Sequence, residues 1–164
     1  MNVHTLNTKA NEVQKSFQSE MDKNKSFQNK MGMTNSIVES ANVDVKKGIV
    51  SIYMVSDISN GAILEGKLYM VFGKEEYVLL GFYNVTSSME TRKLNGNNDL
   101  TKLIETTVNS FEFNDSRKYN PNEVNTGIFS NVLERGFIGA IIGGLFVLIT
   151  GLFLVSTKMR GAVS

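Results

Sequence analysis

Between residues 43 and 85, apolar and polar side chains alternate with a period of two, and β-branched and aromatic residues dominate. This alternation is typical of strands that place side chains on both faces of a sheet. Short polar connections at 57–61 and 73–76 predict turns. The pattern therefore predicts an antiparallel three-strand meander. Its extended segments are 43–55 (a strand pair, or one strand bent at Lys47 and Gly48), 62–72 and 77–85.

Both faces of this meander are apolar. The residues predicted to face the core are Val50, Ile52, Met54, Leu68, Met70, Phe72, Val78, Leu80 and Phe82. The opposite face carries tyrosines that alternate with these residues. An apolar face of this kind needs a cover, which could be another element or another molecule. We therefore treat as a candidate interaction face Tyr53, Tyr69, Tyr77 and Tyr83.

Helices are predicted on either side of the meander in sequence. In residues 6–33, apolar residues recur three or four positions apart, and Asn24 interrupts the stripe. This amphipathic helix could lie on anionic lipid or pack on the sheet, and its thin apolar face favours packing. A second helix is expected after Asn98 or Asp99, either of which is a good N-cap. Its predicted core-facing residues are Leu100, Leu103, Ile104, Val108 and Phe111.

The run 137–156 has no charged residue and spans about 20 positions, the length that a helix needs to cross the bilayer core. Arg135 precedes it, and Lys158 and Arg160 follow it, so both ends carry cations that can reach the headgroups. A buried helix of a globular core and a lipid-anchor tail that is later removed are the alternatives. The preceding residues are too few to surround a buried helix of this length. We therefore expect a retained transmembrane helix.

The predicted organisation is an amphipathic helix at 1–33, an α+β domain at 34–113, a polar tether at 114–135, the transmembrane helix at 136–157 and a short tail at 158–164. The predicted fold class is therefore α+β, a small antiparallel three-strand meander flanked by helices, plus one C-terminal transmembrane helix. The N-terminal residues contain no apolar signal segment. We therefore expect a tail-anchored protein with its soluble domain in the cytoplasm rather than outside, although the flanking positive charges are nearly balanced.

Small residues follow one ridge of the predicted transmembrane helix. Gly139 and Gly143 form a G-x-x-x-G motif, and Ala140 with Gly144 adds an overlapping pair. Small residues at this spacing let a second helix approach closely, although glycine is also common in membrane helices for other reasons. A second copy of the chain or a partner membrane protein could pack here.

Candidate chemistry is sparse. The chain has no cysteine and one histidine, His4, so thiolate and histidine sites have almost no ligands. Glu75 and Glu76 fall in a predicted turn, where solvated charge is expected, and no phosphate-binding glycine motif is present. The sequence therefore predicts no catalytic, cofactor-binding or metal site. A net charge of +1, with 17 basic and 16 acidic residues interleaved, gives no reason to expect nucleic acid as a partner.

Two short sequence pieces carry a family resemblance. They are Gly66-Lys67-Leu68-Tyr69 in an extended segment and Ser110-Phe111 at the end of the last predicted helix. Over residues 30–113 the chain resembles the C-terminal half of the PsbP/Mog1-like superfamily, whose N-terminal strands it lacks. The resemblance implies a non-catalytic binding or assembly domain and transfers no site residue.

These observations predict a single-pass, membrane-anchored, non-enzymatic interaction or accessory protein. The alternative is a peripheral lipid- or small-ligand-binding domain held at the membrane.

Overall fold

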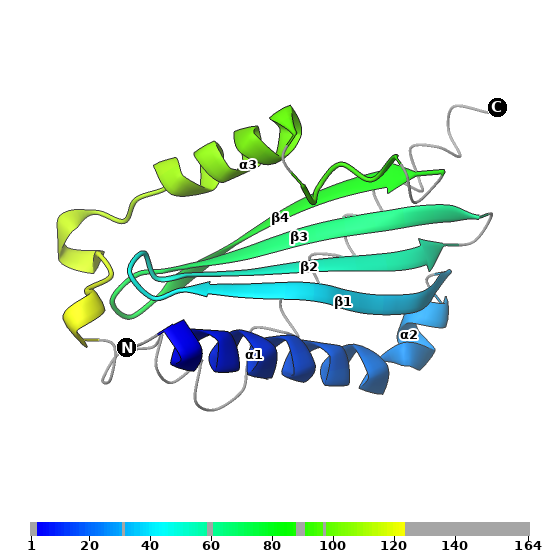
Figure 1. The fold of residues 1–164 in the computed structure, drawn as a ribbon, viewed down its shortest axis with the longest axis horizontal. Helices are drawn as coiled ribbons and strands as arrows, with labels where there is room; N and C mark the ends of the chain where they lie inside the picture. The colour runs from blue at the N-terminus through cyan, green and yellow to red at the C-terminus, as the bar shows by residue number, and fades with distance from the viewer. Residues whose placement is uncertain (1–2, 31, 59–60, 88–90, 97, 124–164) are drawn as a thin grey trace.

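A computed structural model describes residues 3–30, 32–58, 61–87, 91–96 and 98–123. They form one antiparallel sheet of four strands in the order β1-β2-β3-β4, with helices on its two faces (Figure 1). The elements are α1 (Val3–Lys23), α2 (Lys25–Lys30), β1 (Met33–Asp44), β2 (Ile49–Ile58), β3 (Ala62–Phe72), β4 (Tyr77–Thr86) and α3 (Asp99–Ser110), followed by two short 3-10 turns. The α+β class is confirmed, and the sheet has four strands rather than three.

The additional strand is β1, which begins at the last residue of the segment expected to be helical and ends within 43–55, where a strand pair is one of the two interpretations. Its pairing with β2 shifts register twice, between Thr34 and Ile37 and between Val38 and Ser40. Asn35 adopts a φ of 49° in the first irregularity, where its side-chain amide donates to the Asp57 carboxylate at 2.9 Å. Because each bulge inserts one residue, the strand changes which face its odd-numbered residues occupy. Alternation is therefore lost in the sequence although the strand is continuous.

The sheet separates two hydrophobic clusters. The α1-side cluster contains Val13, Phe17, Met21, Met33, Val38, Val43, Val50, Ile52, Met54, Leu64, Leu68, Met70 and Phe72. The α3-side cluster contains Tyr53, Val55, Ile63, Tyr69, Val71, Leu94, Ile104 and Val108. Both faces of the central strands are thus covered, which explains why β2 and β3 are apolar on both sides.

The four candidate tyrosines do not share a face. Tyr53 and Tyr69 lie in the α3-side cluster, whereas Tyr77 and Tyr83 pack against the α1-side cluster. The cause is the β3–β4 register, in which Phe72 pairs with Tyr77. Residues directly opposite in an antiparallel pair project to the same face. The predicted faces of β4 are therefore exchanged, and Leu80 and Phe82 pack on the α3 side.

The N-terminal helix packs on the sheet, which is the arrangement that its thin apolar stripe favours over binding to lipid. Val13, Phe17 and Met21 of α1 are buried, and α1 lies along β1 (Figure 1). Its polar residues also contact the strand. The Gln14 amide donates to the carbonyls of Val38 and Glu39. Helix α1 ends at Lys23 and α2 begins at Lys25, so the break falls at Asn24.

Two glutamines one helical turn apart cover the middle of the outer edge of β1, from Ser36 to Glu39. The Gln18 amide donates to the Ser36 carbonyl at 3.1 Å, and its side-chain oxygen accepts from the Val38 amide at 2.7 Å. Together with Gln14, this side chain supplies hydrogen-bond partners that a neighbouring strand would otherwise supply. Edge strands in native proteins are commonly blocked against such pairing.

Helix α3 begins where the sequence predicts. Asn98 is its N-cap, and its side-chain oxygen accepts from the Thr101 amide at 2.9 Å. The buried residues are Thr101, Ile104 and Val108. Leu103 is 63% exposed and Leu100 is 38% exposed, so these two are not core residues. The buried stripe has the spacing i, i+3, i+7 and includes a threonine.

The segment that follows α3 is docked on the sheet for its described length. Lys74 donates its backbone N–H to the Arg117 carbonyl at 2.8 Å. The Tyr119 hydroxyl donates to the Val45 carbonyl at 2.7 Å. Residues 114–123, expected to begin the tether, therefore join the β1–β2 and β3–β4 turns at one end of the sheet.

The described helices include none that is long and apolar enough to cross a membrane. The predicted transmembrane helix at 136–157, with Gly139, Ala140, Gly143 and Gly144, lies outside the described residues.

Candidate functional site

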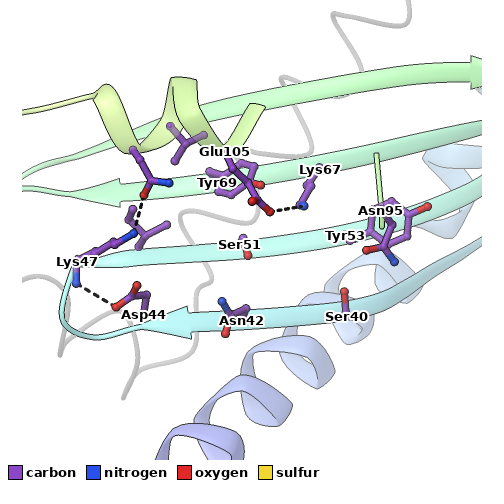
Figure 2. Close-up of a pocket in the computed structure, with 13 residues that line it drawn as sticks. Ser40, Asn42, Asp44, Lys47, Ser51, Tyr53, Lys67, Tyr69, Asn95 and Glu105 are labelled. Atoms are coloured by element: carbon purple, nitrogen blue, oxygen red, sulfur yellow. Dashed lines mark hydrogen bonds and ion pairs between the residues drawn. The ribbon is translucent and has the colours of Figure 1, made fainter. Parts of the chain in front are cut away.

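A polar groove lies on the α3 side of the sheet, between helix α3 and the exposed parts of β1 and β2 (Figure 2). Its volume is about 340 Å³. The residues that line it are Ser40, Asn42, Asp44, Lys47, Ile49, Ser51, Tyr53, Lys67, Tyr69, Asn95, Glu105, Val108 and Asn109. Helix α3 covers β3 through Ile104 and Val108 and leaves this side of β1 open.

The floor of the groove is formed by small polar side chains on two paired strands. Asn42 of β1 lies opposite Ser51 of β2, and Ser40 lies opposite Tyr53. The β1 bulge at Glu39 puts Ser40 and Asn42 on this face, because it shifts the register by one residue. Within the described part of the chain, the side chains of Ser40, Asn42 and Ser51 make no hydrogen bond to protein. They offer both donors and acceptors to whatever occupies the groove.

Lys67 of β3 brings a positive charge to the wall of the groove. Its side chain is only 12% exposed, and its ammonium lies 5.6 Å from the centroid of the Tyr69 ring. Its ion-pair partner is Glu105 of α3, at an N–O distance of 3.7 Å. This separation exceeds that of a hydrogen bond. The Lys67 side chain is therefore largely buried along its length, and its ammonium faces the groove with a loosely held counter-ion.

One end of the groove is closed by a contact between the β1–β2 turn and α3. The Lys47 ammonium donates to the side-chain oxygen of Asn109 at 2.9 Å. The turn itself is held by Asp44, whose carboxylate accepts from the backbone N–H groups of Lys46 and Lys47 at 3.0 and 3.1 Å. Asp44 and Lys47 are thus each hydrogen-bonded within the protein, to neutral partners.

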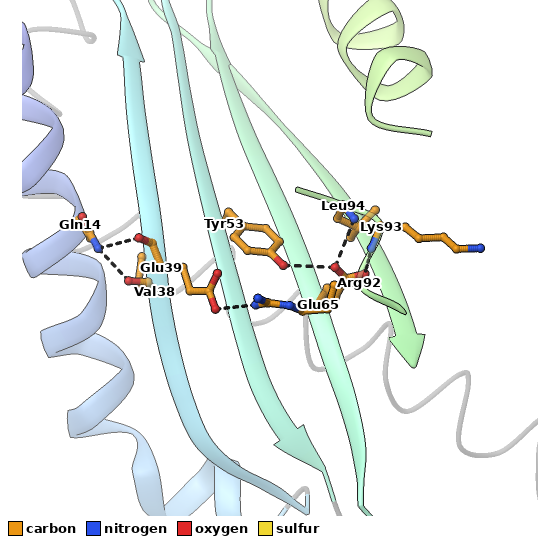
Figure 3. Close-up of polar contacts among 8 residues, drawn as sticks. All are labelled: Gln14, Val38, Glu39, Tyr53, Glu65, Arg92, Lys93 and Leu94. Atoms are coloured by element: carbon orange, nitrogen blue, oxygen red, sulfur yellow. Dashed lines mark hydrogen bonds and ion pairs between the residues drawn. The ribbon is translucent and has the colours of Figure 1, made fainter. Parts of the chain in front are cut away.

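Beyond the other end of the groove, Glu65 forms a buried polar centre (Figure 3). Its side chain is fully buried, and its carboxylate accepts hydrogen bonds from two side chains and two backbone N–H groups. The donors are the Tyr53 hydroxyl at 3.2 Å, the Asn84 amide at 2.6 Å and the backbone of Lys93 at 2.9 Å and Leu94 at 3.2 Å. A buried carboxylate is tolerated because its lone pairs are satisfied in this way.

This centre fixes the connection between β4 and α3. Leu94 is buried in the α3-side cluster, and the Lys93 carbonyl accepts from the side chains of Asn98 and Thr101. Arg92 forms an ion pair with Glu39 in the bulge of β1. The described part of the connection therefore lies over β3, its Arg92 side chain reaches β1, and Asn95 lies at the end of the groove (Figures 2 and 3).

Tyr53 belongs to both the groove and the buried centre. Burial, followed by the nearby Glu65 carboxylate, raises the pKa of Tyr53 well above its usual range. The phenol is therefore protonated at neutral pH and acts as a hydrogen-bond donor to Glu65. Burial, followed by the Glu105 carboxylate, raises the pKa of Tyr69 to about 12. The Tyr69 hydroxyl is buried and has no hydrogen-bond partner in the structure.

Of the site residues predicted from sequence, the structure brings Tyr53 and Tyr69 together at the groove and places Tyr77 and Tyr83 on the other face. Sequence reasoning missed Lys67 and Glu65. The sequence does mark these two residues, because they are the only charged residues of β3 and lie two positions apart in an otherwise apolar strand. Residues at this spacing share a face.

Among the described residues, no group of three or more His, Cys, Asp or Glu side chains is placed to hold a metal ion. The groove presents an ammonium, hydroxyls and amides, which are groups suited to binding polar ligands.

No protein-family model, curated protein or solved structure matches this chain.

Proposed function

We propose that this chain is a single-pass, membrane-anchored protein whose α+β domain works by binding rather than by catalysis, in an interaction or accessory role. The observation that carries the proposal is the uncharged run at 137–156, which follows the folded domain and has the length of a bilayer span. The resemblance to the PsbP/Mog1-like superfamily, stated above as an expectation, supports a binding role. The soluble domain is proposed to lie on the cytoplasmic side.

The absence of native cysteine allows a direct test. Lys102 is an exposed position of α3, and Lys102→Cys gives the chain a single thiol. With a cytoplasmic domain, a membrane-impermeant maleimide should label this variant only after the cells are opened. The protein should also stay in the membrane fraction at alkaline pH. Labelling in intact cells would contradict the orientation, and release at alkaline pH would contradict the anchor.

The anchor is further proposed to pair with a second copy or with a partner membrane protein through Gly139, Ala140, Gly143 and Gly144. Close approach at small residues is a common basis of helix association in membranes. Gly143→Ile should abolish self-association of the anchor in a membrane association assay without reducing insertion. Leu145→Ile, a change outside the small-residue positions, is the control. Equal association of all three proteins would remove the self-pairing part of the proposal.

The alternative function, small-ligand binding by the domain at the membrane, is favoured by a separate observation. The groove beside α3 combines an ammonium that has no hydrogen-bonded partner in the described structure with three polar side chains that lack protein partners. Pockets that bind small molecules commonly have volumes of about 300–1,000 Å³, and this groove reaches that range. Binding of a small ligand in the groove and anchoring in the membrane are compatible.

A further inference from the structure

We propose that the groove beside α3 binds a small hydroxylated carboxylate, such as a sugar acid, and that the carboxylate of this ligand takes the place of Glu105 beside Lys67. The inference deepens the small-ligand function proposed above by naming its ligand class. It does not depend on how the chain is anchored.

The anion-binding half of the site is Lys67. An ammonium has three N–H donors, all of which a ligand carboxylate can use. In the described structure the Lys67 ammonium makes no hydrogen bond, and its one ion pair, with Glu105, spans 3.7 Å. The Glu105 side chain is 54% exposed, whereas that of Lys67 is 12% exposed. The Lys67 side chain is therefore largely buried along the sheet, and its partner is a surface side chain that can move away into water.

The hydroxyl-binding half is the floor of the groove. Ser51 and Asn42 are paired across β2 and β1, and Ser40 lies two residues before Asn42 on the same face. Each has donors and acceptors that the protein leaves unused. Small polar side chains on a sheet are held at fixed spacing by the backbone, which suits them to a ligand with several hydroxyl groups. An aliphatic acid would leave these groups unpaired.

The charge and the volume of the groove restrict the class of ligand further. If Glu105 moves away, the charged groups that line the groove are Lys67, Lys47 and Asp44. The charges of these three groups sum to +1, which suits a single negative charge better than the two of a phosphate ester. A volume of about 340 Å³ accommodates a monosaccharide-sized molecule.

Calorimetric titration of the full chain in mild detergent provides the test. The probes are glucuronate, glucose and glucose 6-phosphate. Glucuronate should bind about tenfold or more tightly than glucose, because one charge-assisted hydrogen bond accounts for a factor of this order. Lys67→Met keeps the aliphatic stem and should remove the preference for glucuronate. Equal affinity for glucuronate and glucose, or no glucuronate binding at millimolar concentration, would overturn the proposal. Tighter binding of glucose 6-phosphate would overturn the assignment of a carboxylate.

Glu105→Gln separates this proposal from a purely structural ion pair. Since Glu105 competes with the ligand for Lys67, its neutralisation should tighten glucuronate binding by about threefold or more. Glu112→Gln is the matched control, because Glu112 is 71% exposed and pairs with Lys118 away from the groove. It should leave affinity unchanged. Unchanged or weaker binding by a Glu105→Gln protein with the parent's melting temperature would refute the exchange of carboxylates. Membrane retention of the same protein variants tests the proposed anchor independently of ligand binding.

Discussion

The carboxylate of Glu65 accepts a 3.2 Å hydrogen bond from the hydroxyl of Tyr53 at a point where both side chains are removed from water. The two residues lie on neighbouring strands, and the bond links the polar groove to the buried centre under the β4–α3 connection. Asn84, Lys93 and Leu94 donate to the same carboxylate. One side chain therefore organises a connection that runs across three strands.

Glu65→Ala should destabilise the protein strongly. The substitution leaves four donors near a space that water fills poorly, and each unsatisfied buried donor costs about 1–3 kcal/mol. We expect a loss of at least about 3 kcal/mol in the free energy of unfolding, measured by urea denaturation. Glu65→Gln should fall between Ala and the parent, because its amide can accept some of the bonds. Glu75→Ala, at an exposed turn position, is the control. A Glu65→Ala protein as stable as this control would show that the centre is not structural.

Stability should decline at alkaline pH. Burial raises the pKa of Tyr69 and of Tyr83 to about 12 from 10.0. Between about pH 10 and pH 12 the unfolded chain therefore releases protons that the folded chain retains. The free energy of unfolding should fall through this window by up to about 1.4 kcal/mol per pH unit for each tyrosine. Tyr69→Phe and Tyr83→Phe should each reduce this slope in denaturation measured as a function of pH.

The same variants make a contrasting prediction at neutral pH. The hydroxyls of Tyr69 and Tyr83 are buried without partners, so removing either should be neutral or stabilise by about 1 kcal/mol. Tyr119→Phe removes a hydroxyl that donates to the Val45 carbonyl. It should instead cost about 1 kcal/mol. If all three variants lost stability equally, the unpartnered state of the first two hydroxyls would be contradicted.

Gln18→Ala should open the edge of β1. It removes the acceptor of the Val38 amide and the donor to the Ser36 carbonyl, at a cost of about 1–2 kcal/mol. Hydrogen exchange provides the most direct measurement, since the Val38 amide should lose protection while the centre of β3 keeps it. Glu12→Ala, at an exposed position of α1, should change neither. Unaltered exchange at Val38 would mean that the glutamine contact is dispensable.

Gly48→Ala should cost more than Gly61→Ala. Both glycines have positive φ, 64° and 76°, so alanine is strained at either position. At Gly61 an added Cβ meets open space, whereas at Gly48 it would lie 2.6 Å from Cγ of Tyr119. The expected penalty is about 1 kcal/mol at Gly61 and at least about 1 kcal/mol more at Gly48, by thermal denaturation. Equal penalties would show that Tyr119 does not pack on the turn.

Sequence periodicity predicted β2, β3, β4 and α3 closely because each contains regular alternation or a regular helical stripe. It failed for β1 because two bulges set its buried residues, Met33, Val38 and Val43, five positions apart. This spacing matches neither a strand nor a helix. A bulge depends on pairing with another strand, so a single chain segment carries little trace of it.

The groove could not be predicted from sequence for a related reason. Its residues come from β1, β2, β3, the β4–α3 connection and α3, and only the sheet register brings them together. The register also determines which face of the sheet Tyr77 and Tyr83 occupy, because the pairing of Phe72 with Tyr77 fixes the face of every later residue in β4. The length of the turn is related to this register, because pairing Phe72 with Tyr77 leaves a loop of four residues, 73–76. Alternation along each strand alone could not supply it.

The two glutamines of α1 also bear on how many molecules a strand-mediated assembly of this protein can contain. Endless sheet growth requires every molecule to accept a neighbour at both edges. Here addition at β1 would first have to break the contacts of Gln14 and Gln18. The other edge strand of the described sheet is β4, whose ten residues include no charge. Association through strands is therefore easier at β4 than at β1, and joining β4 to β4 about a twofold axis would close the assembly at two copies.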